Sequence, residues 1–98
     1  MHIAISNFRL KDGATEADLL AASETVHRDF ETAHNGMLKR ILIKNPDGTY
    51  ADIDFFADEA AMGQVMAAAE ANPACGTYFG MMDLTGEPAA YEVVKTYE

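Results

Sequence analysis

Positive charge is scarce in this sequence. Seven lysine and arginine residues stand against sixteen acidic residues, which gives a formal net charge of −9. Such a charge repels a phosphate backbone and an anionic membrane surface alike. Nucleic acid and membrane lipid are therefore not expected as partners.

Long apolar runs are missing as well. No stretch approaches the roughly 20 apolar residues that a membrane-spanning helix needs. The first residues, Met1 to Ile5, lack the basic region and the long apolar region of a secretory signal. We expect a cytoplasmic protein.

Cysteine occurs once, at Cys75, so no internal disulfide can form. A lone cysteine fits a reducing compartment and is explained by a small buried side chain or by a reactive thiol. The glycines at Gly76 and Gly80 do not have the spacing of a dinucleotide-binding or phosphate-binding loop. We expect neither a metal nor an organic cofactor.

The 98 residues suffice for one domain, 1–98, in which 49% of the residues are hydrophobic. Periodicity and turn signals predict strands over 3–10, 37–44, 50–56 and 90–97, helices from Thr15 to Gly36 and over 59–71, and a short helical piece within 74–84.

Capping and turn residues mark several of these boundaries. Thr15 and Asp18 are expected to form a capping box, and Gly36 is expected in the left-handed position that ends the first helix. Asp58 is expected to cap the second helix. The turn Asn45-Pro46-Asp47-Gly48-Thr49 predicts a hairpin between the two middle strands.

This order of elements, strand, helix, strand, strand, helix, strand, predicts an α+β fold. Right-handed crossovers give a ferredoxin-like, four-stranded antiparallel sheet with both helices on one face. Apolar residues point to both faces of the predicted strands, as at Ile3, Ile5, Ile53 and Phe55. The face without helices then needs a cover, and we expect a homodimer packed sheet against sheet.

With this element order, the Asp-Gly hairpin and the closing Tyr91-Glu92-Val93-Val94 strand, the chain resembles the dimeric α+β barrel superfamily. Within it, the chain is similar to the antibiotic biosynthesis monooxygenase-like proteins. The resemblance spans nearly the whole chain and rests on pattern. It implies a cavity between sheet and helices, and functions that range from cofactor-independent oxygenases of aromatic polyketides to isomerases and ligand-sensing domains.

Haem degradation, another activity in this superfamily, is not expected. The chain resembles that branch only at Asn7, on the first strand. It contains no tryptophan, and all its histidines lie at or before His34. The quinol-oxidising branch also tends to use a tryptophan.

Candidate catalytic residues are His27, on the first predicted helix near its apolar stripe, and Asp52. A histidine near neutrality suits general base work, but a histidine on a helix flank also has an ordinary structural explanation. Asp52 and Asp54 share a strand face, so enclosure would raise the pKa of one and create an acid–base pair. On an open face they would be solvated or paired with a basic residue such as Arg40.

Substrate-binding candidates are Asn7, Tyr50, Tyr78 and Phe79. The aromatic residues are equally explained as core, and Asn7 joins Asp52 only if both point inward. We expect a cofactor-independent monooxygenase-like enzyme that acts on a small hydrophobic or aromatic metabolite. The alternative is a non-catalytic dimeric module that binds or senses a small molecule.

Overall fold

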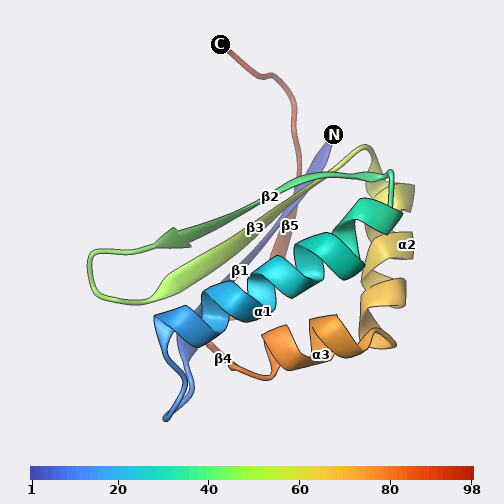
Figure 1. Ribbon diagram of the computed structural model, residues 1–98. Helices are drawn as coiled ribbons and strands as arrows, with labels where there is room; N and C mark the ends of the chain where they lie inside the picture. The colour runs from blue at the N-terminus through green and yellow to red at the C-terminus, as the bar shows by residue number, and fades with distance from the viewer.

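The computed structural model describes residues 1–98 as a five-stranded antiparallel sheet with helices packed on one face (Figure 1). The elements are β1 (His2–Leu10), α1 (Glu16–Asp29), the 3-10 helix η1 (Glu31–Ala33), β2 (Met37–Lys44), β3 (Tyr50–Phe56), α2 (Glu59–Glu70), α3 (Pro73–Phe79), β4 (Met82–Leu84) and β5 (Ala89–Glu92). The α+β, ferredoxin-like prediction is confirmed.

The sheet has one more strand than the sequence predicted. Its order is β2-β3-β1-β4, and β5 also pairs with β1. β5 lies beside the half of β1 from His2 to Ile5, and β4 lies beside the half from Phe8 to Leu10. The fourth position is thus filled by two short strands, because 85–88, which includes Gly86 and Pro88, interrupts the ladder.

Local signals place the first helix and the hairpin as predicted. Thr15 Oγ accepts from the amide of Asp18 at 3.1 Å, and the Asp18 carboxylate accepts from the amide of Thr15 at 3.0 Å. Gly48 takes a positive φ of 88°, which closes the turn between β2 and β3. Asp58 caps α2 by accepting from the amide of Ala61 at 2.8 Å.

The first helix ends earlier than predicted. It stops at Asp29, where the buried Phe30 leaves the helical conformation, and η1 follows. Gly36 has no positive φ and does not cap the helix. It allows a close approach instead, because a Cβ placed there would lie 2.6 Å from the Cβ of Ala61 in α2.

Two predictions for the last third of the chain were also wrong. Only 73–79 of the apolar segment is helical, since Gly80 follows α3 and Met82 to Leu84 joins the sheet. The final strand ends at Glu92 and does not reach Tyr97. One further bond, from the amide of Val93 to the carbonyl of Met1 at 2.8 Å, joins the residue after β5 to the residue before β1, and Val94 and Tyr97 are 93% and 85% exposed.

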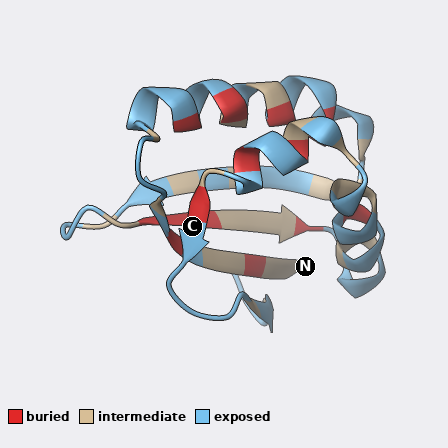
Figure 2. Ribbon diagram, turned by 90° about the horizontal axis from the view of Figure 1, so that it is seen from below, coloured by how far each residue is buried: buried red, intermediate tan, exposed pale blue.

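The core lies between the sheet and the helices, where one cluster of 12 buried residues includes Phe8, Leu19, Phe56 and Tyr78. Figure 2 shows α1 and α3 over one side of the strands and α2 across their end, with buried segments turned toward this layer. The opposite sheet face carries apolar side chains that the chain's own helices do not cover, among them Ile3, Ile5, Ile41, Ile43, Ile53, Phe55 and Tyr91. No helix is both long enough and apolar enough to span a membrane.

Candidate active site

A cavity of about 190 Å³ lies between the helix-facing side of the sheet and the three α-helices. Ten of its 15 lining residues are hydrophobic, so the few polar groups in it stand out. These groups include Ser6, Arg40, Asp52, Asp54 and Tyr78. The exposed side chains of Met66, Glu70 and Phe79 also line the cavity, at its rim.

The sheet register brings four of the polar groups together. Asp52 and Asp54 are alternate residues of β3, so both point to the helix-facing side. Asp52 pairs with Ser6 of β1, and Asp54 pairs with Arg40 of β2. The sequence prediction that the two aspartates share a face therefore holds, and that face is the enclosed one.

Tyr78 reaches this cluster from α3. Asn72 caps that helix by accepting from the amides of Ala74 and Cys75, at 3.0 and 3.2 Å, and Pro73 occupies the first turn. A helix that begins there places Tyr78 over the sheet, with 1% of its surface exposed. The segment after the second predicted helix thus supplies a site residue.

The Tyr78 hydroxyl donates a hydrogen bond to Oδ2 of Asp52, a residue that is 2% exposed. Arg40 approaches the same oxygen, with its Nη1 at 3.4 Å, and its guanidinium carbon lies 5.1 Å from the centre of the Tyr78 ring. Burial and the negative charge of Asp52 raise the pKa of Tyr78. Tyr78 therefore acts as a neutral hydrogen-bond donor.

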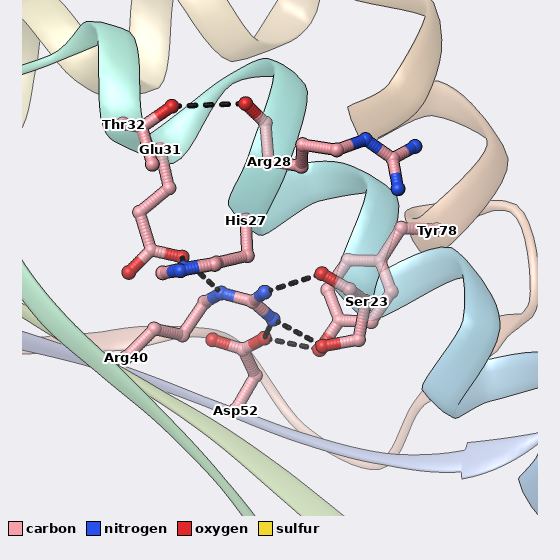
Figure 3. Close-up of polar contacts among 8 residues, drawn as sticks. All are labelled: Ser23, His27, Arg28, Glu31, Thr32, Arg40, Asp52 and Tyr78. Carbon is pink, nitrogen blue, oxygen red and sulfur yellow. Dashed lines mark hydrogen bonds and ion pairs between the residues drawn. The ribbon is translucent and has the colours of Figure 1, made fainter.

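The rest of the Arg40 guanidinium is held by α1 and η1 (Figure 3). Nη1 donates to Oγ of Ser23 at 2.9 Å, and Nη2 donates to the Ser23 carbonyl at 2.8 Å. Nε donates to Oε2 of Glu31 at 3.3 Å, and that oxygen lies 3.1 Å from Nδ1 of His27. Arg40 is thus a buried cation between the carboxylates of Glu31 and Asp52.

The ionisation of Asp54 is strongly affected by its surroundings. Burial, together with the negative charge of Asp52, raises the pKa of Asp54 from 3.8 to about 9. Oδ1 of Asp52 and Oδ1 of Asp54 are both buried without a hydrogen-bond partner in the protein. Near neutral pH Asp54 therefore keeps its proton and can act as an acid in the cavity.

Of the six candidate site residues chosen from the sequence, three line this cavity, namely Asp52, Tyr78 and Phe79, and Asp54 lines it as well. His27 does not. Its side chain is 57% exposed on the far side of Glu31, where it lines a separate polar hollow of about 320 Å³ between α1 and β2. His27 reaches the site only through the contacts of Glu31 with Arg40.

Asn7 and Tyr50 also lie away from the cavity. Asn7 pairs with Ala51 and is exposed, and the alternation of β1 turns it to the face opposite Ser6 and Phe8. Tyr50 does point toward the helices, but at the hairpin end of β3. There its hydroxyl donates to the Glu16 carboxylate at 2.8 Å.

Sequence reasoning did not select Arg40, Glu31 and Ser23 as site residues. Arg40 could have been found from the sequence, because a hairpin closed at Asn45 to Thr49 sets Arg40 opposite Asp54. The position of the Glu31 side chain could not be predicted in the same way, because it depends on where the first helix ends. No group of three or more His, Cys, Asp or Glu side chains is arranged to hold a metal ion.

Comparison with solved structures finds several proteins of similar fold. SnoaB, a cofactor-independent oxygenase from Streptomyces nogalater, superposes with a TM-score of 0.77 at 14% identity, over 97% of this chain and 94% of the other. An antibiotic biosynthesis monooxygenase superposes with a TM-score of 0.69 at 18% identity, over 97% of this chain and 100% of the other. Protein SO0527 from Shewanella oneidensis gives 0.64 at 24% identity, over 92% and 87%.

At the level of sequence, no protein-family model matches the chain, and no curated protein matches it. Identities this low relate the chain to these structures through its fold. The chain is therefore similar in fold to a cofactor-independent oxygenase and to an antibiotic biosynthesis monooxygenase, in agreement with the resemblance inferred from the sequence.

Proposed function

We propose that this protein is a cofactor-independent, monooxygenase-like enzyme that acts on a small hydrophobic or aromatic metabolite. One observation carries the proposal. Two carboxyl groups, Asp52 and Asp54, lie on one strand face in a mostly apolar cavity, and burial raises the pKa of Asp54. The likeness in fold to SnoaB, described as a cofactor-independent oxygenase, supports the reaction type.

The chemistry requires a base because O₂ reacts slowly with neutral closed-shell molecules and faster with organic anions. In the proposed reaction Asp52 removes a proton from an activated C–H or O–H of the substrate, and the resulting anion gives electrons to O₂. For a methylene group the balance is CH₂ plus O₂ giving C=O plus H₂O. The proton transfer moves the negative charge from Asp52 to the substrate, so the net charge of the buried site does not change.

Tyr78 and Arg40 position the base. Both contact Oδ2 of Asp52, which leaves Oδ1 for the substrate. The proton held by Asp54 is then available to the oxygen that leaves as water. His27 has no contact with the cavity, and its role in this proposal is to hold Glu31 against Arg40.

The size of the cavity limits the substrate. Sites for drug-sized ligands usually enclose about 300–1,000 Å³, whereas this cavity encloses about 190 Å³. We therefore propose a substrate of one or two rings. Phe79 and Met66, exposed at the rim, would contact its outer end.

The test measures O₂ uptake with a panel of one-ring and two-ring phenols and activated methylene compounds, with product analysis under isotopically labelled O₂. We expect a product that contains one labelled oxygen atom, and an activity that Asp52→Asn lowers by about 10²–10⁴-fold. Asp12→Asn makes the same charge change in an exposed turn and should retain the activity.

Two results would count against the enzyme. Full activity in Asp52→Asn would remove Asp52 from the mechanism. A ligand that raises the melting temperature and is recovered unchanged under O₂ would support the alternative, a non-catalytic module that binds or senses a small molecule.

We further propose that the protein works as a homodimer joined through the sheet face that its helices leave uncovered. Ile41 and Ile43 are 37% and 40% exposed there, and Tyr91 is 53% exposed. Burying a few hundred Å² of such surface stabilises an association by several kcal/mol, at about 25 cal/mol per Å². Sedimentation should show a dimer at micromolar concentration, and Ile41→Lys should produce folded monomers. A wild-type monomer at that concentration would refute the dimer.

A further inference from the structure

The charged cluster beside and within the cavity contains more carboxyl groups than its one buried cation can neutralise. Glu31 and Asp52 both contact the Arg40 guanidinium, at 3.3 and 3.4 Å, and Asp54 lies beside Asp52 on the same strand face. One arginine side chain is therefore the only buried positive charge near three carboxyl groups. His27, the other base in contact with this group, is 57% exposed behind Glu31.

Two carboxyl oxygens of this group have no partner among the other side chains of the protein. Asp52 is 2% exposed and lines the cavity, and its Oδ1 has no partner in the protein. Oδ1 of Asp54 is buried and also without a partner. Without a ligand the proton of Asp54 is the donor shared with Asp52, so a ligand that displaces this proton must bring donors of its own.

From this arrangement we infer that the cavity binds a compact primary ammonium ion with an apolar or aromatic body, its charged end between Asp52 and Asp54. The ammonium brings the second positive charge that the cluster lacks, and its N–H groups meet the two unpartnered oxygens. The apolar walls, which include Val26, Phe30 and Phe56, receive the hydrocarbon part.

The same geometry works against an anionic ligand. A carboxylate in this space would lie against two carboxyl groups, and the nitrogen atoms of Arg40 are already directed at Ser23, Glu31 and Asp52. A neutral alcohol meets no such repulsion, but it brings no charge to the pair. The expected order of affinity is thus ammonium, then alcohol, then carboxylate.

Binding of a cation should displace the proton that the pair holds. Without ligand, burial and the charge of Asp52 raise the pKa of Asp54 to about 9, so Asp54 is protonated at neutral pH. An ammonium between the carboxyl groups favours the ionised form and releases that proton. The groups that face Asp54 are Arg40 from β2, Asp52 from β3, Glu31 from η1, Cys75 and Tyr78 from α3, and Glu70 of α2 at the cavity rim.

This inference uses the same cavity as the proposed function, but it concerns binding and needs no turnover. The test compares phenethylamine, phenethyl alcohol and hydrocinnamate by titration calorimetry without O₂. These probes share one aromatic ring and a short chain and differ mainly in the charge of the end group. If the binding test fails, the oxygenase proposal is still tested separately by the O₂ uptake assay.

We expect phenethylamine to bind at least about tenfold more tightly than the alcohol near neutral pH, and the carboxylate to bind most weakly. Titration in two buffers with different heats of protonation should show the release of up to about one proton with the amine and none with the alcohol. The affinity for the amine should rise between pH 6 and 8, by at most about tenfold per pH unit, while that for the alcohol stays constant.

Asp54→Asn is the decisive variant because it keeps the shape of the side chain and removes the displaceable proton. It should abolish proton release and the pH dependence, and bring the affinity for the amine close to that for the alcohol. Asp12→Asn, with the same charge change in an exposed turn, should behave as the wild type. No binding of phenethylamine at millimolar concentration, binding without proton release, or tighter binding of hydrocinnamate would each overturn the inference.

Discussion

Tyr78 and Asp52 are 26 residues apart in the sequence, yet the hydroxyl of the first donates directly to the carboxylate of the second. The bond joins α3 to β3 across the floor of the cavity, and both residues are almost completely buried. The position of the third helix is therefore coupled to the state of the carboxyl pair. Removing either partner should affect both stability and binding.

Tyr78→Phe tests this bond. The change leaves Oδ2 of Asp52 with Arg40 as its only donor, at 3.4 Å, and should lower the free energy of unfolding by about 1–2 kcal/mol. Urea denaturation measures the loss. Tyr97→Phe removes a hydroxyl from a residue that is 85% exposed and should cost less than about 0.5 kcal/mol. Equal losses in the two variants would contradict the importance of the buried bond.

Arg40→Met tests the role of the buried cation. The substitution leaves the carboxylates of Glu31 and Asp52 without their counter-charge, so we expect a loss of about 3–5 kcal/mol in the free energy of unfolding. Adding Glu31→Gln should recover part of the loss. In contrast, Arg28→Met removes an ion pair whose arginine side chain is 65% exposed, and it should cost less than about 1 kcal/mol. A small effect of Arg40→Met would mean that the cluster relaxes or admits water.

The raised pKa of Asp54 predicts a specific dependence of stability on pH. Between 3.8 and about 9 the folded protein binds a proton at Asp54 that the unfolded chain has already released. The contribution of Asp54 to the free energy of unfolding therefore falls as the pH rises through this window. Asp54→Asn should become progressively more stable than the wild type toward pH 9, by about 1–3 kcal/mol.

Urea denaturation at several pH values measures this difference. Asp83→Asn, on an exposed position of β4, provides the comparison and should follow the wild-type pH profile. If the difference between Asp54→Asn and the wild type is independent of pH, the proton is not held at Asp54.

The close approach of Gly36 to α2 leaves no room for a side chain at this position, just before β2. In Gly36→Ala the new Cβ would lie 2.6 Å from the Cβ of Ala61, so α2 or β2 must shift, at a cost of about 1–3 kcal/mol. Gly63 lies within α2 and has open space around its Cβ position, and Gly63→Ala should stabilise the protein by about 0.5–1 kcal/mol. Melting temperatures of the two variants should therefore move in opposite directions.

Much of the architecture follows from local signals in the sequence. Thr15 and Asp18 determine where α1 begins, and Gly48 supplies the positive φ that the hairpin needs. Such signals act over a few residues, so they are readable without the fold. The end of α1 is different, because Phe30 and Glu31 leave the helix to reach the core and Arg40, which are partners distant in sequence.

The candidate site was harder to predict from the sequence for the same reason. The alternation of β3 placed Asp52 and Asp54 on one face, but only the packing of α3 shows that this face is enclosed and that Tyr78 covers it. Asn7 and Tyr50 were selected by residue type. The register of β1 turns Asn7 away from the cavity, and Tyr50 lies at the hairpin end beside Glu16.

The division of the fourth sheet position between β4 and β5 has a consequence for protein engineering. Each short strand has its own ladder to a different half of β1, and 85–88 between them is exposed. Lengthening an exposed surface connection costs little conformational entropy. A peptide epitope or a fluorescent label inserted after Gly86 would leave both ladders and the carboxyl pair in place, so this joint is a suitable attachment point for following the molecule in solution.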